Sequence, residues 1–443
     1  MQAIKTFLEQ DQYLKNSNPK ERIIAHIDMN SYFATVEQQA NPRLRGKPIG
    51  VSGKFIPENL KRSVIAAASV EAKARGVKTA MPLWEARRIC PDLLVIPGDP
   101  DKYETVTKKF LKIFERHTPE IEIFSIDEAF LDLTETPLNP PLLRGEIGGS
   151  DGKYELAEKI ALRIKAAIRQ EIGEWLSCSI GIGPNKMIAK LSSDQQKPNG
   201  LVVTRPRDVE KLLAKVELTD ICGIASRLER RLHNLGIKKP LEMGRASEKL
   251  LKSEFGSWGK MFKLWGQGLD PSPIVPYYLG NAPKSMGHSY TLPRNTNDWL
   301  EVKKYLYLMA NKVGRRLRRE AYAGRSLSVL LRTADFHHLW QVKKFKDFFN
   351  DSFVIYDLAL RIIKSWHFKG SVRLVGVSVG ELTEMKNLTP SLIPKDKKIL
   401  KVLKAQDKIN DKFGELTITR GAFFKTKLRT QVGGFFEKEK LSL

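Results

Sequence analysis

The chain has 443 residues, 42% of them hydrophobic, and carries 75 lysines and arginines against 50 acids. This length exceeds one hydrophobic core, because domains usually hold about 100 to 200 residues. No apolar run reaches the roughly 18 residues that span a bilayer, and the first residues lack a signal peptide's apolar core. These features exclude a membrane-spanning protein and predict a cytoplasmic one. The net charge of +25 indicates a polyanionic partner, either nucleic acid or an anionic membrane surface.

The first strong element is the apolar run Ile23–Ile27, which predicts a buried strand and ends at Asp28. A helical pattern follows at once and stops at Asn41-Pro42. Free backbone N–H groups at a helix start can hold phosphate, so this junction is a candidate triphosphate site beside Asp28. Residues 30–98 then predict a small α/β module inserted after the strand. The polar residues 1–21 predict a loosely docked leader.

The stretch Ile121–Leu133 alternates apolar and polar residues and places Asp127 and Glu128 in its middle. Neighbouring side chains on one strand point to opposite faces, so two convergent acids need a turn. We therefore predict a hairpin with both acids at or beside its tip. An Asp-Glu pair can simply solvate a turn. A nearby strand that delivers Asp28 favours instead an all-oxygen site of the kind that Mg²⁺ takes.

Residues 134–153 are crowded with proline and glycine and predict a disordered insertion. After the predicted strand Cys178–Gly183 comes a helix that carries Lys186 and Lys190 four residues apart on one face. Such lysines are usually just solvated. Here they follow a strand of the same sheet, which makes them candidates for contacts with a triphosphate or a nucleic-acid backbone.

Residues 218–237 have the form helix, Gly-Ile-Ala turn, helix, which is typical of a helix-hairpin-helix but also of an ordinary helical hairpin. In the first case the turn at Gly223 and Ala225 directs backbone amides at a phosphate. A proline-rich linker precedes a separate α/β domain with a long basic helix. The positive side chains that favour a phosphate-tracking surface in this domain include Lys312, Arg315, Arg316, Arg318, Arg319 and Arg325. The three cysteines, Cys90, Cys178 and Cys222, have no metal-ligand spacing and should be reduced.

Four stretches together resemble the Y-family translesion DNA polymerases, most closely the bacterial DNA polymerase IV type. They are IDMNSYFATVE, SIDEAFLDL, GIGPNKMIAKLSSDQQKPNG and DICGIASRLERRLHNLGI. The resemblance covers about residues 22–383 and implies a multidomain α/β, right-hand polymerase with a helix-hairpin-helix thumb. Its implied parts are a palm (22–29 and 99–197), small fingers (30–98), a thumb (198–268), a linker (269–283), a little finger (284–383) and a basic tail (384–443).

The resemblance also implies roles for individual residues. Asp28, Asp127 and Glu128 match the catalytic carboxylates, which would hold two Mg²⁺ ions together with the carbonyl of Met29. The implied nucleotide-binding residues are Asn30, Ser31, Tyr32, Phe33, Lys73 and Lys190, with Phe33 as the steric gate against ribonucleotides. The implied DNA-binding residues are Lys186, Gly223, Ala225, Arg315, Arg316, Arg318, Arg319 and Arg325.

Some positions depart from the family pattern. Asn30 stands where many relatives have Asp, and Val70 and Lys73 replace the usual Tyr and Arg that hold the triphosphate. The stretch Gln431–Phe436 keeps the Gln and a Phe of a sliding-clamp peptide but lacks its central Leu. The resemblance implies primer–template DNA and dNTPs as partners, and a sliding clamp only through this incomplete peptide.

The resemblance implies low-fidelity translesion synthesis by a monomer, through two-metal-ion transfer from a dNTP to a primer 3′-OH with release of pyrophosphate. No stretch resembles a proofreading exonuclease. One alternative is a catalytically weak, DNA-binding accessory protein of the same fold, which the intact acids argue against. Another is a nucleotide cyclase built on a similar palm, which leaves the helical hairpin and the basic C-terminal domain unexplained.

Overall fold

The computed structural model describes residues 22–53, 62–135, 149–279, 282–366, 368, 370–389, 394–414 and 417–421. These residues divide into two compact units, with the boundary at residues 280 and 281. Apart from Arg62, which groups with the second unit, the described residues up to 279 form the first unit. Among the described residues, no helix combines the length and the apolar content that crossing a bilayer requires.

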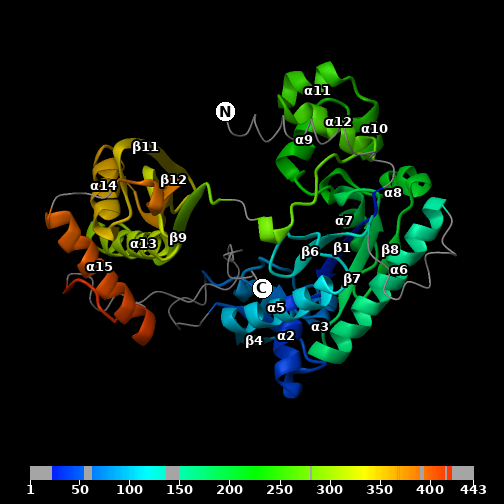
Figure 1. The fold of residues 1–443 in the computed structure, drawn as a ribbon, viewed down its shortest axis with the longest axis horizontal. Helices are drawn as coiled ribbons and strands as arrows, with labels where there is room; N and C mark the ends of the chain where they lie inside the picture. Colours follow the sequence, from blue (N-terminus) through cyan, green and yellow to red (C-terminus); the bar gives the residue numbers. More distant parts are fainter. Residues whose placement is uncertain are drawn as a thin grey trace. The chain divides into compact units, whose positions relative to one another are not determined.

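A five-stranded sheet of order β5-β6-β1-β7-β8 forms the centre of the first unit (Figure 1). Its strands are β1 (Ile24–Met29), β5 (Ile121–Ile123), β6 (Glu128–Asp132), β7 (Cys178–Gly183) and β8 (Leu201–Val203). The central strand β1 pairs antiparallel with both β6 and β7, and β7 pairs parallel with β8. The predicted hairpin is therefore β5 and β6, joined by residues 124–127.

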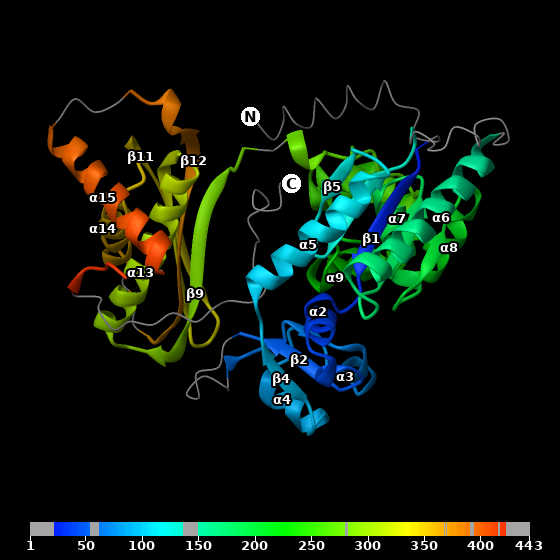
Figure 2. The same ribbon diagram turned by 60° about the horizontal axis from the view of Figure 1, so that its bottom comes forward.

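The two faces of this sheet have different covers. On one face, Ala25, Ile27 and Met29 belong to a core with the helices α5 (Pro100–Glu115) and α6 (Gly149–Ala167), which run beside the strands in Figure 2. On the other face lies α7 (Lys186–Gln195), which packs against β7 and β1. This approach requires a glycine, because a Cβ at Gly181 would lie 2.1 Å from the carbonyl oxygen of Ala189.

Helix α6 begins earlier than expected. The predicted insertion, residues 134–153, falls mostly on residues 136–148, which lie outside the described residues, but its last five residues are the first turns of α6. Asp151 stands in the first turn, where a carboxylate favours helix formation through the helix dipole. It also pairs with Arg205 and Arg207, each at 3.1 Å. The ion pairs and the dipole outweigh the glycines that predicted a loop.

A second, three-stranded sheet of order β3-β2-β4 lies within residues 42–97. It belongs to the region where sequence analysis predicted a small α/β module, and its strand β4 pairs parallel with β2. A small core that includes Ile65, Ala68, Ala72, Leu83 and Cys90 holds the sheet and its helices together. The elements are α2 (Tyr32–Ala40), η1 (Pro42–Leu44), β2 (Ile49–Ser52), β3 (Ala67–Ala68), α3 (Val70–Ala74), α4 (Leu83–Ile89) and β4 (Leu94–Pro97).

Residues 206–266 are helical and share a core of their own around Leu213, Leu232, Met243 and Phe262. The elements are η5 (Pro206–Asp208), α8 (Val209–Lys215), η6 (Leu218–Asp220), α9 (Ser226–Asn234), α10 (Pro240–Arg245), α11 (Glu248–Phe255) and α12 (Trp258–Gly266). The chain then runs along β5 and ends its described part of this unit in η7 (Tyr277–Leu279). Glu122 on β5 accepts a hydrogen bond from the Val275 amide at 2.9 Å, so the start of the predicted linker is bound to the sheet edge.

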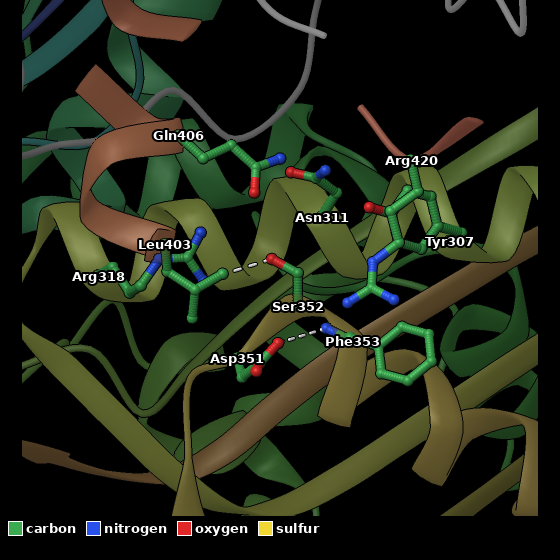
Figure 3. A pocket seen from close by; sticks show the side chains of 9 residues that line it. All are labelled: Tyr307, Asn311, Arg318, Asp351, Ser352, Phe353, Leu403, Gln406 and Arg420. Atoms are coloured by element: carbon green, nitrogen blue, oxygen red, sulfur yellow. Dashed lines mark hydrogen bonds between the residues drawn. The ribbon is translucent and has the colours of Figure 1, made fainter. Parts of the chain in front are cut away.

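The second unit is an antiparallel sheet of order β11-β10-β12-β9, with α13 and α14 packed on one face. Its elements are β9 (Ser285–Thr296), α13 (Trp299–Arg319), β10 (Tyr322–Thr333), β11 (His338–Phe349), α14 (Ser352–Lys364), β12 (Val372–Glu384), η8 (Met385–Asn387) and α15 (Pro394–Phe413). Sequence analysis did not predict β11 or α14. It assigned α15 to a basic tail, whereas α15 packs against the helices of this unit (Figure 3).

Candidate active site

The pairing of β1 with β6 brings the three predicted acids together. Asp28 lies directly opposite Glu128, and opposite residues of an antiparallel pair share one face of the sheet. Asp127 immediately precedes β6, and its carbonyl oxygen accepts a hydrogen bond from the Met29 amide at 2.9 Å. The site therefore lies at the end of β1, on the face that α7 covers.

The environments of the carboxylates differ. Burial raises the pKa of Asp127 to about 6, and the neighbouring charges of Asp28 and Glu128 act in the same direction against a hydrogen bond from Ser125. Burial would also raise the pKa of Glu128, but His26 and Lys190 hydrogen-bond to it, and the charge of Lys190 adds to their effect. The pKa of Glu128 is therefore about 2, so Glu128 stays ionised at a pH low enough to protonate Asp127.

Two lysines neutralise the acids. Lys190 Nζ lies 2.5 Å from Glu128 Oε2, and Lys197 Nζ lies 2.6 Å from Asp28 Oδ2. Burial opposes the charge of Lys197, but Asp28 and Asp194 outweigh it and raise the pKa of Lys197. Sequence analysis predicted Lys190 but missed Lys197, although the stretch that ends in Lys-Pro-Asn-Gly marked the region.

The donor set suits a hard divalent cation, because carboxylate and carbonyl oxygens are its preferred ligands. In the described part of the chain, no three His, Cys, Asp or Glu side chains lie at the spacing of a formed metal site. Here lysine ammonium groups contact two of the three carboxylates. Burial, and after it the charges of Asp28 and Glu128, raise the pKa of Asp127, and a bound divalent cation would favour its ionised form. Asp28, Asp127, Glu128 and the Met29 carbonyl therefore fit a metal.

His26 is a further residue of the site that sequence analysis missed. Its ring is completely buried and bridges Ser193 Oγ on α7, at 2.8 Å, to Glu128 Oε2, at 3.1 Å. Burial lowers the pKa of His26, which favours the neutral ring. His26 stands two residues before Asp28 on β1 and so faces the same side of the sheet, which was the available signal.

The residues after Asp28 have distinct surroundings. The Asn30 carboxamide binds Ser177, Ser179 and the Asn199 amide, at 2.8 to 3.1 Å, and so ties the end of β1 to neighbouring segments. The Tyr32 hydroxyl lies in the interior and donates to the Tyr103 carbonyl at 2.8 Å. The side chains of two predicted nucleotide-binding residues thus point into the protein.

Ser31 and Phe33 lie at the start of α2. Ser31 has a φ of 48°, in the left-handed region, and its carbonyl accepts the amides of Ala34 and Thr35. The Phe33 ring stacks on Tyr103, with centroids 4.4 Å apart and planes 22° apart. Phe33 stands five residues after Asp28 in the chain, and its stack on Tyr103 leaves the ring little freedom to move.

The remaining predicted lysines lie in different places. Lys73 on α3 has a pKa lowered by burial and by the charge of Lys197, while Asp28 and Asp127 oppose the shift, so Lys73 lies within electrostatic range of the acids. Lys186 instead binds both carboxylate oxygens of Glu122, at 2.7 and 2.8 Å, and joins α7 to β5. The structure thus brings Lys73 and Lys190 to the site and gives Lys186 an intramolecular partner.

The predicted phosphate-binding turn lies between η6 and α9. Gly223 has a φ of +102°, which an L side chain rarely adopts, and Ala225 caps α9. The apolar side chains of Ile221 and Ile224 are buried and anchor the turn, while Cys222 is exposed. The geometry is that of a tight turn that projects from the helical core.

The predicted arginines of the second unit all lie near protein groups of their own chain. Arg315 and Arg318 are mostly buried, with 16% and 9% of their side chains exposed, and bind aspartates of α15. Arg325 pairs with Glu381 at 2.8 Å, and Arg319 pairs with Glu320 at 2.9 Å. Arg316 is half-buried on α13. The role of these residues in DNA binding stays a prediction.

Comparisons with known proteins cover both units. Residues 27–194 match the impB/mucB/samB family, and residues 283–392 match the C-terminal domain of that family. DNA polymerase IV of Bacillus velezensis is 32% identical over 95% of this chain and 97% of its own. DNA polymerase IV of Pelotomaculum thermopropionicum is 34% identical over 89% of this chain and 93% of its own. A solved Y-family DNA polymerase chimera matches with a TM-score of 0.69 and 29% identity, over 82% of this chain and 99% of that chain.

Proposed function

The chain belongs to the Y family of DNA polymerases, which confirms the predicted family and right-hand polymerase fold, and from this premise we propose low-fidelity translesion synthesis at the Asp28 site. The observation that carries the proposal is the pairing of Asp28 opposite Glu128, with Asp127 beside them. Its substrates are primer–template DNA and dNTPs. The product is a primer longer by one nucleotide, with pyrophosphate released.

Y-family DNA polymerases use divalent metal ions, and we propose two Mg²⁺ ions for this chain. Asp28, Asp127, Glu128 and the Met29 carbonyl would hold them. The ions would lower the pKa of the primer 3′-OH and stabilise charge on the leaving pyrophosphate. His26 fixes the orientation of Glu128 through the 3.1 Å hydrogen bond, so that carboxylate needs little reorganisation.

Positive side chains around the acids suit a triphosphate. Lys190 and Lys197 are long, flexible side chains, and both can turn from a carboxylate to a phosphate oxygen. Lys73 adds a third positive charge from α3. Phe33 would collide with a ribose 2′-OH, because its stack on Tyr103 keeps the ring in place. The side chains of Asn30 and Tyr32, in contrast, support the site from within the protein.

Two surfaces suit the DNA backbone. The turn at Gly223 and Ala225 exposes backbone without a bulky side chain. In the second unit, the sheet face away from α13 and α14 presents small residues such as Ser328 and Gly376, beside the exposed ring of Trp340 and the charge of Arg332. A flat, positively charged face of small side chains lets a phosphate backbone approach closely without base-specific contacts.

The small size of the module at residues 42–97 supports tolerance of damaged templates. Its core consists of a few small and medium side chains, and its three-stranded sheet has short strands. A module of this size contacts only a small part of a base pair, so it can exclude few pairs of distorted shape. We propose that synthesis lacks proofreading. The clamp peptide at 431–436 lies outside the described residues, and clamp binding and the monomeric state stay predictions.

The proposal is tested by primer extension with Mg²⁺. Asp127→Asn should abolish extension and leave binding of primer–template in a gel shift unchanged. Asp101→Asn, which alters an exposed acid on α5, is the matched control and should extend like the wild type. Extension by Asp127→Asn at the wild-type rate would exclude the site. A wild-type chain that binds primer–template but never extends it would favour an accessory protein.

Damage tolerance is tested separately, with a running-start primer and a template that carries one abasic site. The proposal expects extension past the lesion and retention of a mismatched 3′ end. Removal of the mismatched end before extension would contradict the absence of proofreading.

A further inference from the structure

Helix α15 is held against α13 by a specific set of ion pairs. Asp407 accepts hydrogen bonds from two nitrogens of Arg318, at 2.6 and 2.9 Å, and Asp411 binds Arg315 at 2.6 Å. Figure 3 shows Leu403 and Gln406 of the same helix turned toward α13 and α14. A two-pronged arginine–carboxylate pair fixes direction as well as distance. One face of α15 is therefore committed to the second unit.

The far end of α15 is also fixed. The buried Asn410 side chain binds both the amide and the carbonyl of Ile418, at 2.8 and 3.2 Å. This returns the chain toward α14, where the Arg420 guanidinium lies 3.9 Å from the ring centroid of Phe353 (Figure 3). The helix therefore cannot rotate about its axis without breaking these contacts of its C-terminal half.

The opposite face of α15 carries a row of lysines. Lys401, Lys404, Lys408 and Lys412 are separated by three, four and four residues, so they share one face of the helix. Lys398 precedes them by three residues. We name these five residues the lysine stripe. All five are exposed, and within the described ranges none of them pairs with an acid.

We propose that the lysine stripe binds the phosphate backbone of duplex DNA. From Lys401 to Lys412 the helix rises about 17 Å, over which one strand of B-DNA carries about five phosphates. The spacing of the lysines thus suits one strand of a duplex. This site goes beyond the proposed active site, because the stripe lies on the helical side of the second unit rather than on its open sheet face.

The docking of α15 also gives a role to two arginines that sequence analysis assigned to DNA binding. Arg315 and Arg318 do not face solvent; they orient α15, and α15 presents the positive charge outward instead. Asp407 and Asp411, the acids of α15 that the structure describes in ion pairs, bind Arg318 and Arg315 of α13. The negative charges of these two acids are therefore compensated by α13, whereas the lysines of the stripe have no acidic partner within the described residues.

Other polyanions suit this face less well. A membrane-surface helix needs a continuous apolar face, but Leu403 lies in the packed pocket, and the polar Gln406 interrupts the exposed side chains Ile399, Val402 and Phe413. Single-stranded nucleic acid is held by aromatic stacking between the charges, and Phe413 stands only at the end of the stripe. Duplex DNA needs phosphate contacts alone.

The test is the salt dependence of duplex binding by the full chain. Lys401→Gln, Lys404→Gln and Lys408→Gln are combined in one variant. The control, Lys109→Gln, Lys112→Gln and Lys159→Gln, removes the same charge from exposed positions of α5 and α6. Affinity for a fluorescent duplex of about 40 base pairs is measured between about 50 and 200 mM salt.

Three lost phosphate contacts should reduce the slope of log affinity against log salt by about 2.7. The ratio of the wild-type affinity to the stripe-variant affinity should then fall roughly 40-fold between about 50 and 200 mM salt. The control should change the slope clearly less. Single-nucleotide insertion at saturating DNA should be unchanged in both variants, which separates this result from any failure of the active-site proposal.

Equal slopes for the stripe variant and the control would overturn the proposal. So would a stripe variant that binds duplex normally but loses binding to vesicles of phosphatidylcholine and phosphatidylglycerol. Unchanged thermal melting of the variant shows that it is folded, which is expected because the substituted side chains are exposed.

Discussion

We predict that Tyr103 determines how well Phe33, the proposed steric gate, rejects ribonucleotides. The Phe33 ring stacks on the Tyr103 ring, which is completely buried. The Tyr103 hydroxyl donates to Glu37 at 2.8 Å, and Glu37 also binds Lys102 at 2.8 Å. The Tyr32 hydroxyl binds the Tyr103 carbonyl from the other side. The backing of the gate is therefore itself held in place.

The size of the effect follows from the stack. An aromatic pair contributes about 0.5 to 1.5 kcal/mol beyond its buried area. If Tyr103→Leu removes that restraint on the Phe33 ring, discrimination between dNTP and rNTP should fall roughly two- to thirteen-fold. Tyr103→Phe keeps the ring and loses one hydrogen bond to a carboxylate. It should reduce stability by about 1.5 to 3 kcal/mol and leave discrimination unchanged.

The assay compares kcat/KM for insertion of dGTP and rGTP opposite dC in the wild type, Tyr103→Phe, Tyr103→Leu and Phe33→Ala. Phe33→Ala removes the proposed gate, so it defines the largest loss of discrimination between dGTP and rGTP that is expected in this series. Urea unfolding of each variant confirms that the protein is folded. If Tyr103→Leu discriminates like the wild type while Phe33→Ala does not, the stack plays no part in the gate. If Tyr103→Phe loses as much as Tyr103→Leu, the hydroxyl rather than the ring positions Phe33.

Three further predictions test other parts of the structure. Gly181→Ala should reduce stability by about 1 to 3 kcal/mol or more in urea unfolding, because its Cβ would overlap the Ala189 carbonyl of α7. Gly421→Ala, which has open space around it, should be neutral, and equal losses would refute the packing argument. Burial lowers the pKa of His117 below 6.5, and the charges of Arg163 and Arg116 add to this effect. The contribution of the neutral His117 ring to folding stability is therefore complete above pH 6.5 and is lost as the pH falls below that value. His117→Gln should therefore weaken the fall in the urea midpoint between about pH 7.5 and 5, and an unchanged fall would contradict this assignment. Iodoacetamide should modify the exposed Cys222 much faster than the two buried thiols. If the Gly223 turn contacts DNA, bound primer–template should slow the modification of Cys222. An unchanged rate of modification would show that the turn does not contact the DNA.

The meeting of the three acids was predictable because it depends on short-range patterns. The apolar run before Asp28 predicts a buried strand, and the alternation around Asp127 and Glu128 predicts a hairpin. Two such elements that end in acids can satisfy their backbone hydrogen bonds by pairing with each other. The structure pairs β1 with β6 and places Asp28 opposite Glu128.

The lysines around the acids were less predictable. Lys186 and Lys190 share a helix face, and nothing in their spacing distinguishes them. The structure gives Lys186 to Glu122 and Lys190 to Glu128. Lys197 follows the end of α7 and reaches Asp28, 169 positions earlier in the chain. Such partners depend on how the helix lies across the sheet, which the close contact at Gly181 determines.

The second unit shows why a cluster of like charges does not by itself identify a binding surface. The arginines near the end of α13 predict a polyanion site if no acid of the chain reaches them. Arg318 is separated from Asp407 by 89 positions, so local sequence cannot reveal this partner. Once α15 is docked, Arg315 and Arg318 are mostly buried, whereas the lysines on its other face are exposed to a partner. The net charge correctly indicates a polyanion, but the docking of one helix decides which side chains can meet it.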